Sequence, residues 1–342
     1  MLLHLIMLFL PFTTPTPLET LGNLDFPDPS VTYDPFTQKW YAFATQSNTI
    51  HVQVASSSSF PGANPSKWEY LPQTDLLPVP GKWVNSTAAR IWAPDIHFIN
   101  ATQTWVMYYS GLLSGSEYHC VGVAVSNTSS ILGPYTAEEE PFACPASEGG
   151  AIDASGFYDR EEGTRWVIYK VDGSAKGPGG LCGNGVPPGE PTPFRLQQVD
   201  AKDGITKIGE AIEVLDRDPE VDGPLIEAPS LVKVGGGGGG GGGCGAKWVL
   251  FYSSHCWNSD EYDVKYAVSQ RGVKGPYERR GQLIGKKRED FGFVSPGGAS
   301  AIVVENDGGG GAMVFHADCP AGRCMYEAEW VIGVDGIVGV VE

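Results

Sequence analysis

Five segments of the chain repeat one pattern of apolar and polar positions. In each, an opening that contains proline or alanine leads into a short strand, a turn, and then an apolar strand. The segments are residues 27–46, 93–111, 151–173, 227–255 and 295–318. Each is followed by a stretch in which apolar and polar residues largely alternate, as in a half-buried strand: 50–57, 121–127, 194–201, 263–270 and 323–330. Sustained helical periodicity is hard to find anywhere.

The repeats predict an all-β fold, a five-bladed β-propeller. Each apolar strand has a large anchoring side chain, and these residues are Trp40, Trp105, Trp166, Trp248 and Met313. Repeats of four short strands, roughly 60 to 70 residues each, are typical of sheets arranged radially around an axis. We expect one propeller domain over residues 21–342. A β-sandwich with coincidental turn spacing is the alternative. The glycine run at 235–243 lies between two strands and favours a surface loop.

Composition and charge narrow the function. The chain of 342 residues has 42% hydrophobic residues, 46 glycines and 26 prolines, which suits a turn-rich β-protein. Its formal net charge of −17 argues against binding to nucleic acid or to an anionic membrane, since both need clustered basic residues.

The N-terminus and three sequons indicate secretion. Residues 1–12 are an apolar run too short to span a bilayer, and residues 1–20 are predicted to be a secretory signal peptide. A buried N-terminal strand is the alternative. Asn85, Asn100 and Asn127 begin glycosylation sequons. No later run of 18 apolar residues suggests a membrane anchor. We therefore expect a secreted, extracellular glycoprotein.

Seven cysteines fit an oxidising compartment. Some should pair, and an odd number leaves at least one free. Cys319 and Cys324 are close enough to close a tight local loop. A zinc site formed by these two and His316 is disfavoured, because no second cysteine pair accompanies them.

Three acids open repeats of the predicted propeller. Asp28, Asp153 and Glu227 stand where inner strands begin, so we expect them to converge at one mouth of the central channel. Converging carboxylates without a basic cluster suit glycoside hydrolysis, in which one acid protonates the leaving oxygen and one base activates water. Asp95 occupies a related opening and is a candidate for substrate binding. Turn or strand-end hydrogen bonds, and calcium binding, are the alternatives for these acids.

The segments FPDPSV (26–31), RIWAPDIHF (90–98), AIDASGFYD (151–159) and EAPSLVK (227–233) together resemble the motifs of glycoside hydrolase family 43. Members are five-bladed propeller enzymes that attack arabinans and xylans with inversion of the anomeric centre. The resemblance implies that Asp28 is the general base and Glu227 the general acid. It implies that Asp153 orients the acid and tunes its pKa. Its implied substrate-binding residues are Phe26, Trp92 and Arg323.

One departure from the family bears on metal binding. Many members open the fifth blade with Gly-Pro-Gly-His, whose histidine lies near a central metal, whereas this chain has SPGGAS at 295–300. We therefore expect no required metal or cofactor, and a channel calcium stays an alternative. His255 and His316 are predicted to be structural.

The expected function is that of a secreted, inverting and monomeric glycosidase. Its partner would be a plant cell-wall polysaccharide or an oligomer of one, cleaved at arabinofuranosyl or xylosyl linkages. The sequence ends soon after the fifth repeat, which favours arabinan over xylo-oligosaccharides. Three alternatives stay open: a β-xylosidase, a non-catalytic carbohydrate-binding propeller and a protein-interaction propeller.

Overall fold

The computed structural model describes residues 20–48, 50–62, 66–235, 245–286, 292–304 and 309–341. The predicted signal peptide, except for Thr20, lies outside the described residues, as do Cys244 and most of the glycine run. The described part is almost entirely β-structure, with two short 3-10 helices, η1 (Ala146–Glu148) and η2 (Gly173–Ala175). No helix within these ranges is long and apolar enough to cross a membrane.

Within the described residues, twenty strands form five antiparallel sheets of four, each sheet taken from consecutive strands. Blade one has β1 (Ser30–Asp34), β2 (Lys39–Ala44), β3 (Gln53–Ser57) and β4 (Trp68–Tyr70). Blade two has β5 (Trp92–Ile99), β6 (Thr104–Leu112), β7 (His119–Ser126) and β8 (Tyr135–Ala137). Blade three has β9 (Ala151–Asp159), β10 (Thr164–Val171), β11 (Phe194–Val199) and β12 (Lys207–Leu215). Blade four has β13 (Ile226–Val234), β14 (Lys247–Ser254), β15 (Asp263–Ser269) and β16 (Glu278–Ile284). Blade five has β17 (Gly297–Val304), β18 (Gly310–Cys319), β19 (Gly322–Ile332) and β20 (Val338–Val340).

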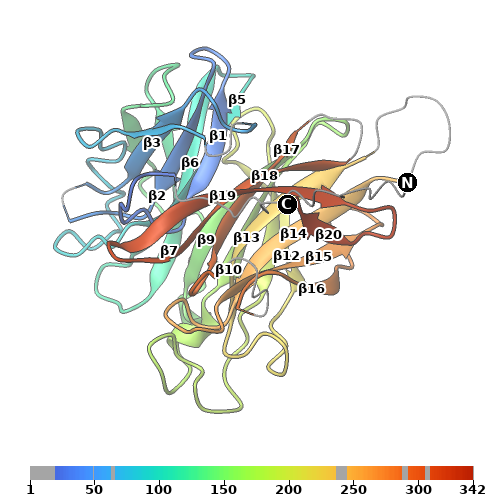
Figure 1. Cartoon of the computed structure of the whole chain (residues 1–342). Helices are drawn as coiled ribbons and strands as arrows, with labels where there is room; N and C mark the ends of the chain where they lie inside the picture. The colour runs from blue at the N-terminus through green and yellow to red at the C-terminus, as the bar shows by residue number, and fades with distance from the viewer. Residues whose placement is uncertain are drawn as a thin grey trace, which may run out of the picture.

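The five sheets form a closed ring, which confirms the predicted propeller. The inner strands β1, β5, β9, β13 and β17 contact one another in sequence, and β17 returns to β1. The C-terminal sheet, red in Figure 1, thus closes the ring against the first. The anchoring tryptophans and Met313 all lie on the second strand of their blade, as the repeat pattern predicted.

The hydrophobic core is divided among the blade interfaces. Five buried clusters are found among the described residues, and each joins side chains of two neighbouring blades. Both faces of each sheet are therefore apolar, because each packs against a neighbour. A single blade would leave both faces in water, so the blades depend on one another for stability.

Residues 20–26 tie the start of the described chain to the last blade. The amide of Thr20 donates to the carbonyl of Met325 at 3.1 Å, and the amide of Phe26 donates to that of Arg323 at 2.8 Å. Nearby, the Asp25 carboxylate accepts from the amide of Arg323. These bonds position the next two residues, Pro27 and Asp28, at the central axis.

Candidate active site

Every blade has a residue in the left-handed backbone region close to the start of its inner strand. The φ values of these five bulge residues are 53°, 34°, 55°, 50° and 60°, and the residues are Asp28, Ala93, Asp153, Ala228 and Gly298. In blades two to five the strand register shifts at this point, which marks a β-bulge. Strained backbone of this kind persists only where the surroundings enforce it, and it clusters at functional sites.

The bulge residues surround a central cavity. Its lining comes from all five inner strands, at residues 28–30, 93–95, 153–155, 228–230 and 298–300. Asp28 and Asp153 occupy the bulge position itself. Glu227 precedes its bulge residue by one position, and Asp95 follows its own by two. The predicted common position therefore holds for Asp28 and Asp153 and is off by one residue for Glu227.

A second ring of residues supports the bulges from the neighbouring blade. At the end of the second strand, opposite the residue before each bulge, the five blades place Thr45, Ser110, Lys170, Ser253 and His316. Four of these accept the amide N–H of the next blade's bulge residue, over 2.9 to 3.4 Å. These bonds fix the strained backbone because they satisfy a donor that the interrupted sheet leaves open.

Blade three breaks this pattern with Lys170. The amide of Ala228, which would otherwise face this position, donates to Oδ2 of Asp153 at 2.9 Å. The Lys170 side chain is 1% exposed, and its Nζ lies 3.0 Å from Asp172 Oδ1 and 3.2 Å from Glu227 Oε2. Although burial alone would lower the pKa of Lys170, the carboxylates of Asp172 and Glu227 raise it above the usual value. Lys170 is therefore a buried cation that faces Glu227.

Both carboxylate oxygens of Glu227 have donors. Lys170 contacts Oε2, and the hydroxyl of Tyr262 donates to Oε1 at 2.9 Å. Tyr262 is buried, and its ring stacks on that of His316 with centroids 5.8 Å apart. These two contacts hold the Glu227 side chain in one orientation beside the central axis.

Asp28 is held as an anion. Its Oδ1 accepts from the Arg323 guanidinium at 3.1 Å, and its Oδ2 accepts from the Thr45 hydroxyl at 2.8 Å. Burial would raise the pKa of Asp28, but Arg323 and Thr45 outweigh burial and place the pKa below its usual value. An ionised carboxylate is the form that a general base requires.

The pKa values of Asp153 and Glu227, in contrast to that of Asp28, are raised. Burial first, and then the negative charge of Glu227, raise the pKa of Asp153 to about 8. Burial also raises the pKa of Glu227, with Lys170 and Tyr262 opposing it and the charge of Asp28 adding to it. Ionising both carboxyls would place two negative charges in one poorly solvated site, so their raised pKa values favour a pair that retains a proton. The site therefore combines one anionic acid with a pair that retains a proton.

The two aromatic residues predicted to bind substrate differ in exposure. Trp92 is partly exposed and stacks on His119, with ring centroids 3.8 Å apart. Phe26 has no exposed surface and packs edge-on against Tyr70, so its position gives no support to stacking on a sugar, which stays a prediction.

Asp95 and Arg323 contact other parts of the propeller. Asp95 is buried, bonds His97 Nε2 at 2.7 Å and accepts the amide of Gly156 from blade three at 2.8 Å. It therefore joins two blades below the mouth, and its predicted contact with substrate stays untested. Arg323 contacts Asp28 directly, as described above.

His316 is not available as a metal ligand in this arrangement. Nδ1 of His316 accepts the amide proton of Asp28 at 3.0 Å, so its proton lies on Nε2, which cannot then be a metal ligand. Burial lowers the pKa of His316 to about 3 and keeps the ring neutral. A Cβ at Gly298 would lie 2.7 Å from that ring, so a histidine cannot be placed at this position without displacing His316. Within the described ranges, no cluster of three or more His, Cys, Asp or Glu residues could hold a metal.

Two residues of the site escaped the sequence analysis. Lys170 lies near the end of the second strand of blade three, at the position that Thr45, Ser110, Ser253 and His316 occupy elsewhere. Aligning the five repeats on their apolar strands would have exposed it as a lysine among small or neutral side chains. Tyr262 lies in the loop before β15, outside the repeated segments, and no sequence pattern marks it.

Comparisons with known proteins agree with this geometry. The profile of Glycosyl hydrolases family 43 matches residues 18–333. A search of curated proteins finds no match. Among solved structures, a thermostable family-43 glycoside hydrolase is similar, with a TM-score of 0.71, 21% identity and 96% of each chain covered. An exo-1,5-alpha-L-arabinanase from a bovine ruminal metagenomic library has a TM-score of 0.64 at 19% identity, covering 98% of this chain and 100% of its own. A xylan beta-1,4-xylosidase from Bacillus halodurans C-125 has a TM-score of 0.63 at 16% identity, covering 96% of this chain and 56% of its own.

Proposed function

The chain belongs to glycosyl hydrolase family 43 and is a glycoside hydrolase, and from this premise we propose that it hydrolyses arabinofuranosyl or xylosyl linkages with inversion. In this proposal Asp28 is the general base and Glu227 the general acid. Asp153 shares a proton with Glu227 and raises its pKa. The substrates are arabinans, xylans or their oligomers.

One observation carries the proposal: the surroundings push the pKa values of neighbouring carboxyls apart. Arg323 and Thr45 keep Asp28 ionised, whereas burial raises the pKa values of both Asp153 and Glu227, with the charge of Glu227 adding to the effect at Asp153 and the charge of Asp28 adding to it at Glu227. An acid and a base that coexist at one pH are what glycoside hydrolysis requires. A carbohydrate-binding propeller without catalysis would have no need of this separation.

The chemistry follows from these states. Asp28 accepts a proton from a water molecule as that water attacks the anomeric carbon. Glu227 gives its proton to the leaving glycosidic oxygen from the other side of the sugar. Inversion needs room for the water, so we expect the two carboxyl groups to lie about 6.5–9.5 Å apart in the substrate complex. Lys170 and Tyr262 keep the acid aimed at the mouth.

The product configuration tests this proposal. We expect NMR spectra taken during the first turnovers to show a product of opposite anomeric configuration to the substrate. Hydrolysis of nitrophenyl arabinofuranoside and nitrophenyl xyloside, followed by product profiles on arabinan and xylan, identifies the sugar. A product that retains its configuration would remove Asp28 from the role of base.

We further propose that the enzyme acts outside the cell. Three disulfides, Cys120–Cys144, Cys182–Cys256 and Cys319–Cys324, support an oxidising environment. The last of these is the local loop anticipated from the sequence. Among the sequons, Asn100 and Asn127 are exposed. Expression in a eukaryotic secretory host should place the protein in the medium with a mass that falls on deglycosylation, and retention inside the cell without glycans would contradict this.

A further inference from the structure

Three loops of blades three and four lie at the same end of the molecule as the acids. The inner strand of each blade starts at the mouth. Because neighbouring strands are antiparallel, the second and fourth strands of each blade end at the mouth. The loop after the second strand and the connection to the next blade therefore both lie at this end of the molecule. The loops 172–193, 216–225 and 255–262 follow β10, β12 and β14 in this way. They form the rim of the mouth on this side.

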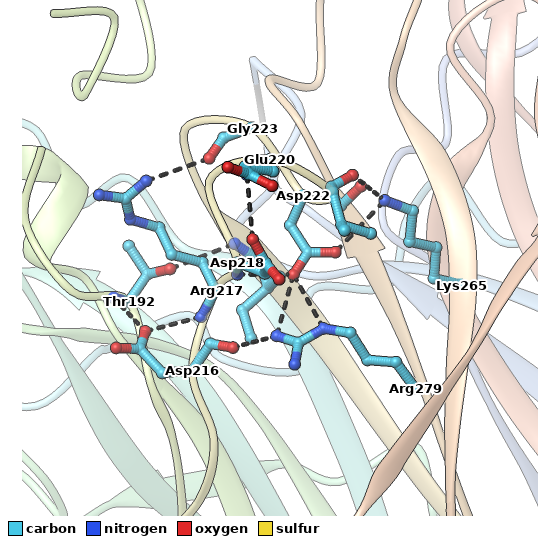
Figure 2. Close-up of polar contacts among 12 residues, drawn as sticks. Thr192, Asp216, Arg217, Asp218, Glu220, Asp222, Gly223, Lys265 and Arg279 are labelled. Atoms are coloured by element: carbon cyan, nitrogen blue, oxygen red, sulfur yellow. Dashed lines mark hydrogen bonds and ion pairs between the residues drawn. The ribbon is translucent and has the colours of Figure 1, made fainter. Parts of the chain in front are cut away.

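The middle loop is fixed by a buried charge network. Asp222 has no exposed surface, and its carboxylate lies 3.2 Å from Lys265 Nζ and 3.0 Å from an Arg279 nitrogen. Figure 2 shows the Asp222 carboxylate between these two cations, with the amide of Asp218 as a further donor. A carboxylate with so many donors holds the loop backbone in one conformation.

Two bridges join this loop to its neighbours. Arg217 donates to the carbonyl of Gly223 in its own loop (Figure 2) and to the carbonyls of Pro188 and Glu190, and so links the loops 172–193 and 216–225. The Cys182–Cys256 disulfide links the first loop to the third. The rim is therefore a connected, rigid structure.

This rigid rim presents apolar side chains to solvent. Trp257, next to Cys256, is 38% exposed, and Leu181, next to Cys182, is 70% exposed. The guanidinium of Arg323 lies 4.9 Å from the centroid of the Trp257 ring, and the same guanidinium binds Asp28. An exposed tryptophan is thus separated from the proposed base by one side chain.

We propose that Trp257 is the platform of a second sugar subsite, outside the catalytic pocket, on which another ring of the oligosaccharide stacks. The proposal rests on the proposed function. Sugar rings have an apolar face of C–H groups that packs on an aromatic ring, and their hydroxyls can bond to polar groups of the surrounding rim. A tryptophan held by a disulfide and a buried ion network loses little conformational entropy on binding, which favours affinity.

Trp257→Ala tests the subsite by comparing two substrates. We expect kcat/KM on arabinotriose or xylotriose, whichever the wild type cleaves, to fall at least about tenfold more than kcat/KM on the nitrophenyl monoglycoside. Trp257→Phe should recover much of the loss. Phe36→Ala is the control. It removes an exposed aromatic side chain from the β1–β2 turn, at the end of blade one that is opposite to the mouth, and should change kcat/KM on neither substrate. Thermal unfolding checks that each variant is folded.

A binding measurement separates the possible failures. In a Glu227→Gln background, the added Trp257→Ala change should raise the Kd for the same trisaccharide at least about tenfold by calorimetry. Equal losses on both substrates, with an unchanged trisaccharide Kd, would show that Trp257 only supports Arg323, and the subsite would be refuted. If the wild type hydrolyses none of these glycosides, the proposed function fails instead.

Discussion

Replacing Lys170 with methionine should move the alkaline limb of the pH–rate profile upward. Lys170 Nζ lies 3.2 Å from Glu227 Oε2 in a buried setting. At an effective dielectric constant of about 20, this separation corresponds to about 5 kcal/mol, an upper bound of roughly four pKa units. Opposite charges at such distances commonly lower the pKa of a carboxyl by about 1–3 units. Loss of the cation should therefore raise the pKa of Glu227, so the acid stays protonated to higher pH.

The assay is kcat/KM against pH on a nitrophenyl glycoside, which reports the ionisation of the free enzyme. Asp28, Asp153 and Tyr262 also face Glu227, and none of them changes in this variant. We expect the alkaline limb to rise by about 1–3 pH units, with a lower maximal rate because Glu227 loses one of its two donors. Lys170→Arg retains the charge and should leave the limb near its original position.

Stability provides the control for this variant. Lys170 also binds Asp172, whose carboxylate keeps a bond from the Ser174 hydroxyl at 2.7 Å. Removing one member of a buried ion pair costs about 3–5 kcal/mol, which urea unfolding should detect. A folded Lys170→Met enzyme whose alkaline limb does not move would show that Lys170 does not set the pKa of the acid.

Three further predictions concern the acids themselves. Asp153→Asn removes the second ionisable carboxyl of the pair, so Glu227 can lose its proton without forming a second adjacent anion, and the alkaline limb should move to lower pH; a limb that stays in place in the folded variant would show that Asp153 is not the tuning residue. Arg323→Met should raise the pKa of Asp28 and move the acidic limb to higher pH, because the base then ionises later; an unchanged acidic limb would separate Asp28 from the base role. Glu227→Gln should lose far more activity on natural oligosaccharides than on nitrophenyl glycosides, whose leaving group needs little protonation, and equal losses would make Glu227 structural.

The propeller could be predicted from the sequence because the pattern that specifies each blade lies within one short segment and recurs five times. The sequence of each blade repeats an apolar strand that contains Trp40 or its counterpart. A strand in which apolar and polar residues largely alternate follows it. Five copies in order leave few other arrangements. The same repetition placed Asp28 and Asp153 correctly, since both stand at the start of an inner strand.

The finer geometry depends on features that no local pattern encodes. The β-bulges shift the register by one residue, so alternation alone could not separate the position of Glu227 from that of Asp153. Phe26 is buried in a cluster that includes Val314 and Met325 of blade five, which are distant in sequence. Lys170 reads as an ordinary strand-end lysine until the fold buries it between two acids. Such residues become recognisable only when their neighbours in space are known.

The closure of the ring through residues 20–26 and blade five has a consequence for biosynthesis. The two hydrogen-bond partners of Glu227, Lys170 and Tyr262, lie 57 and 35 residues from it in the sequence. Asp28 can form its contact with the Arg323 guanidinium only after a further 295 residues have been synthesised. Until then the first blade carries an open apolar face and an unmatched charge, a liability during translation. A nascent chain cut short before blade five would thus contain the proposed acid with both its partners but would lack Arg323, the partner of the proposed base. On the proposed function, we therefore expect catalytic activity only from chains whose translation has reached the last blade.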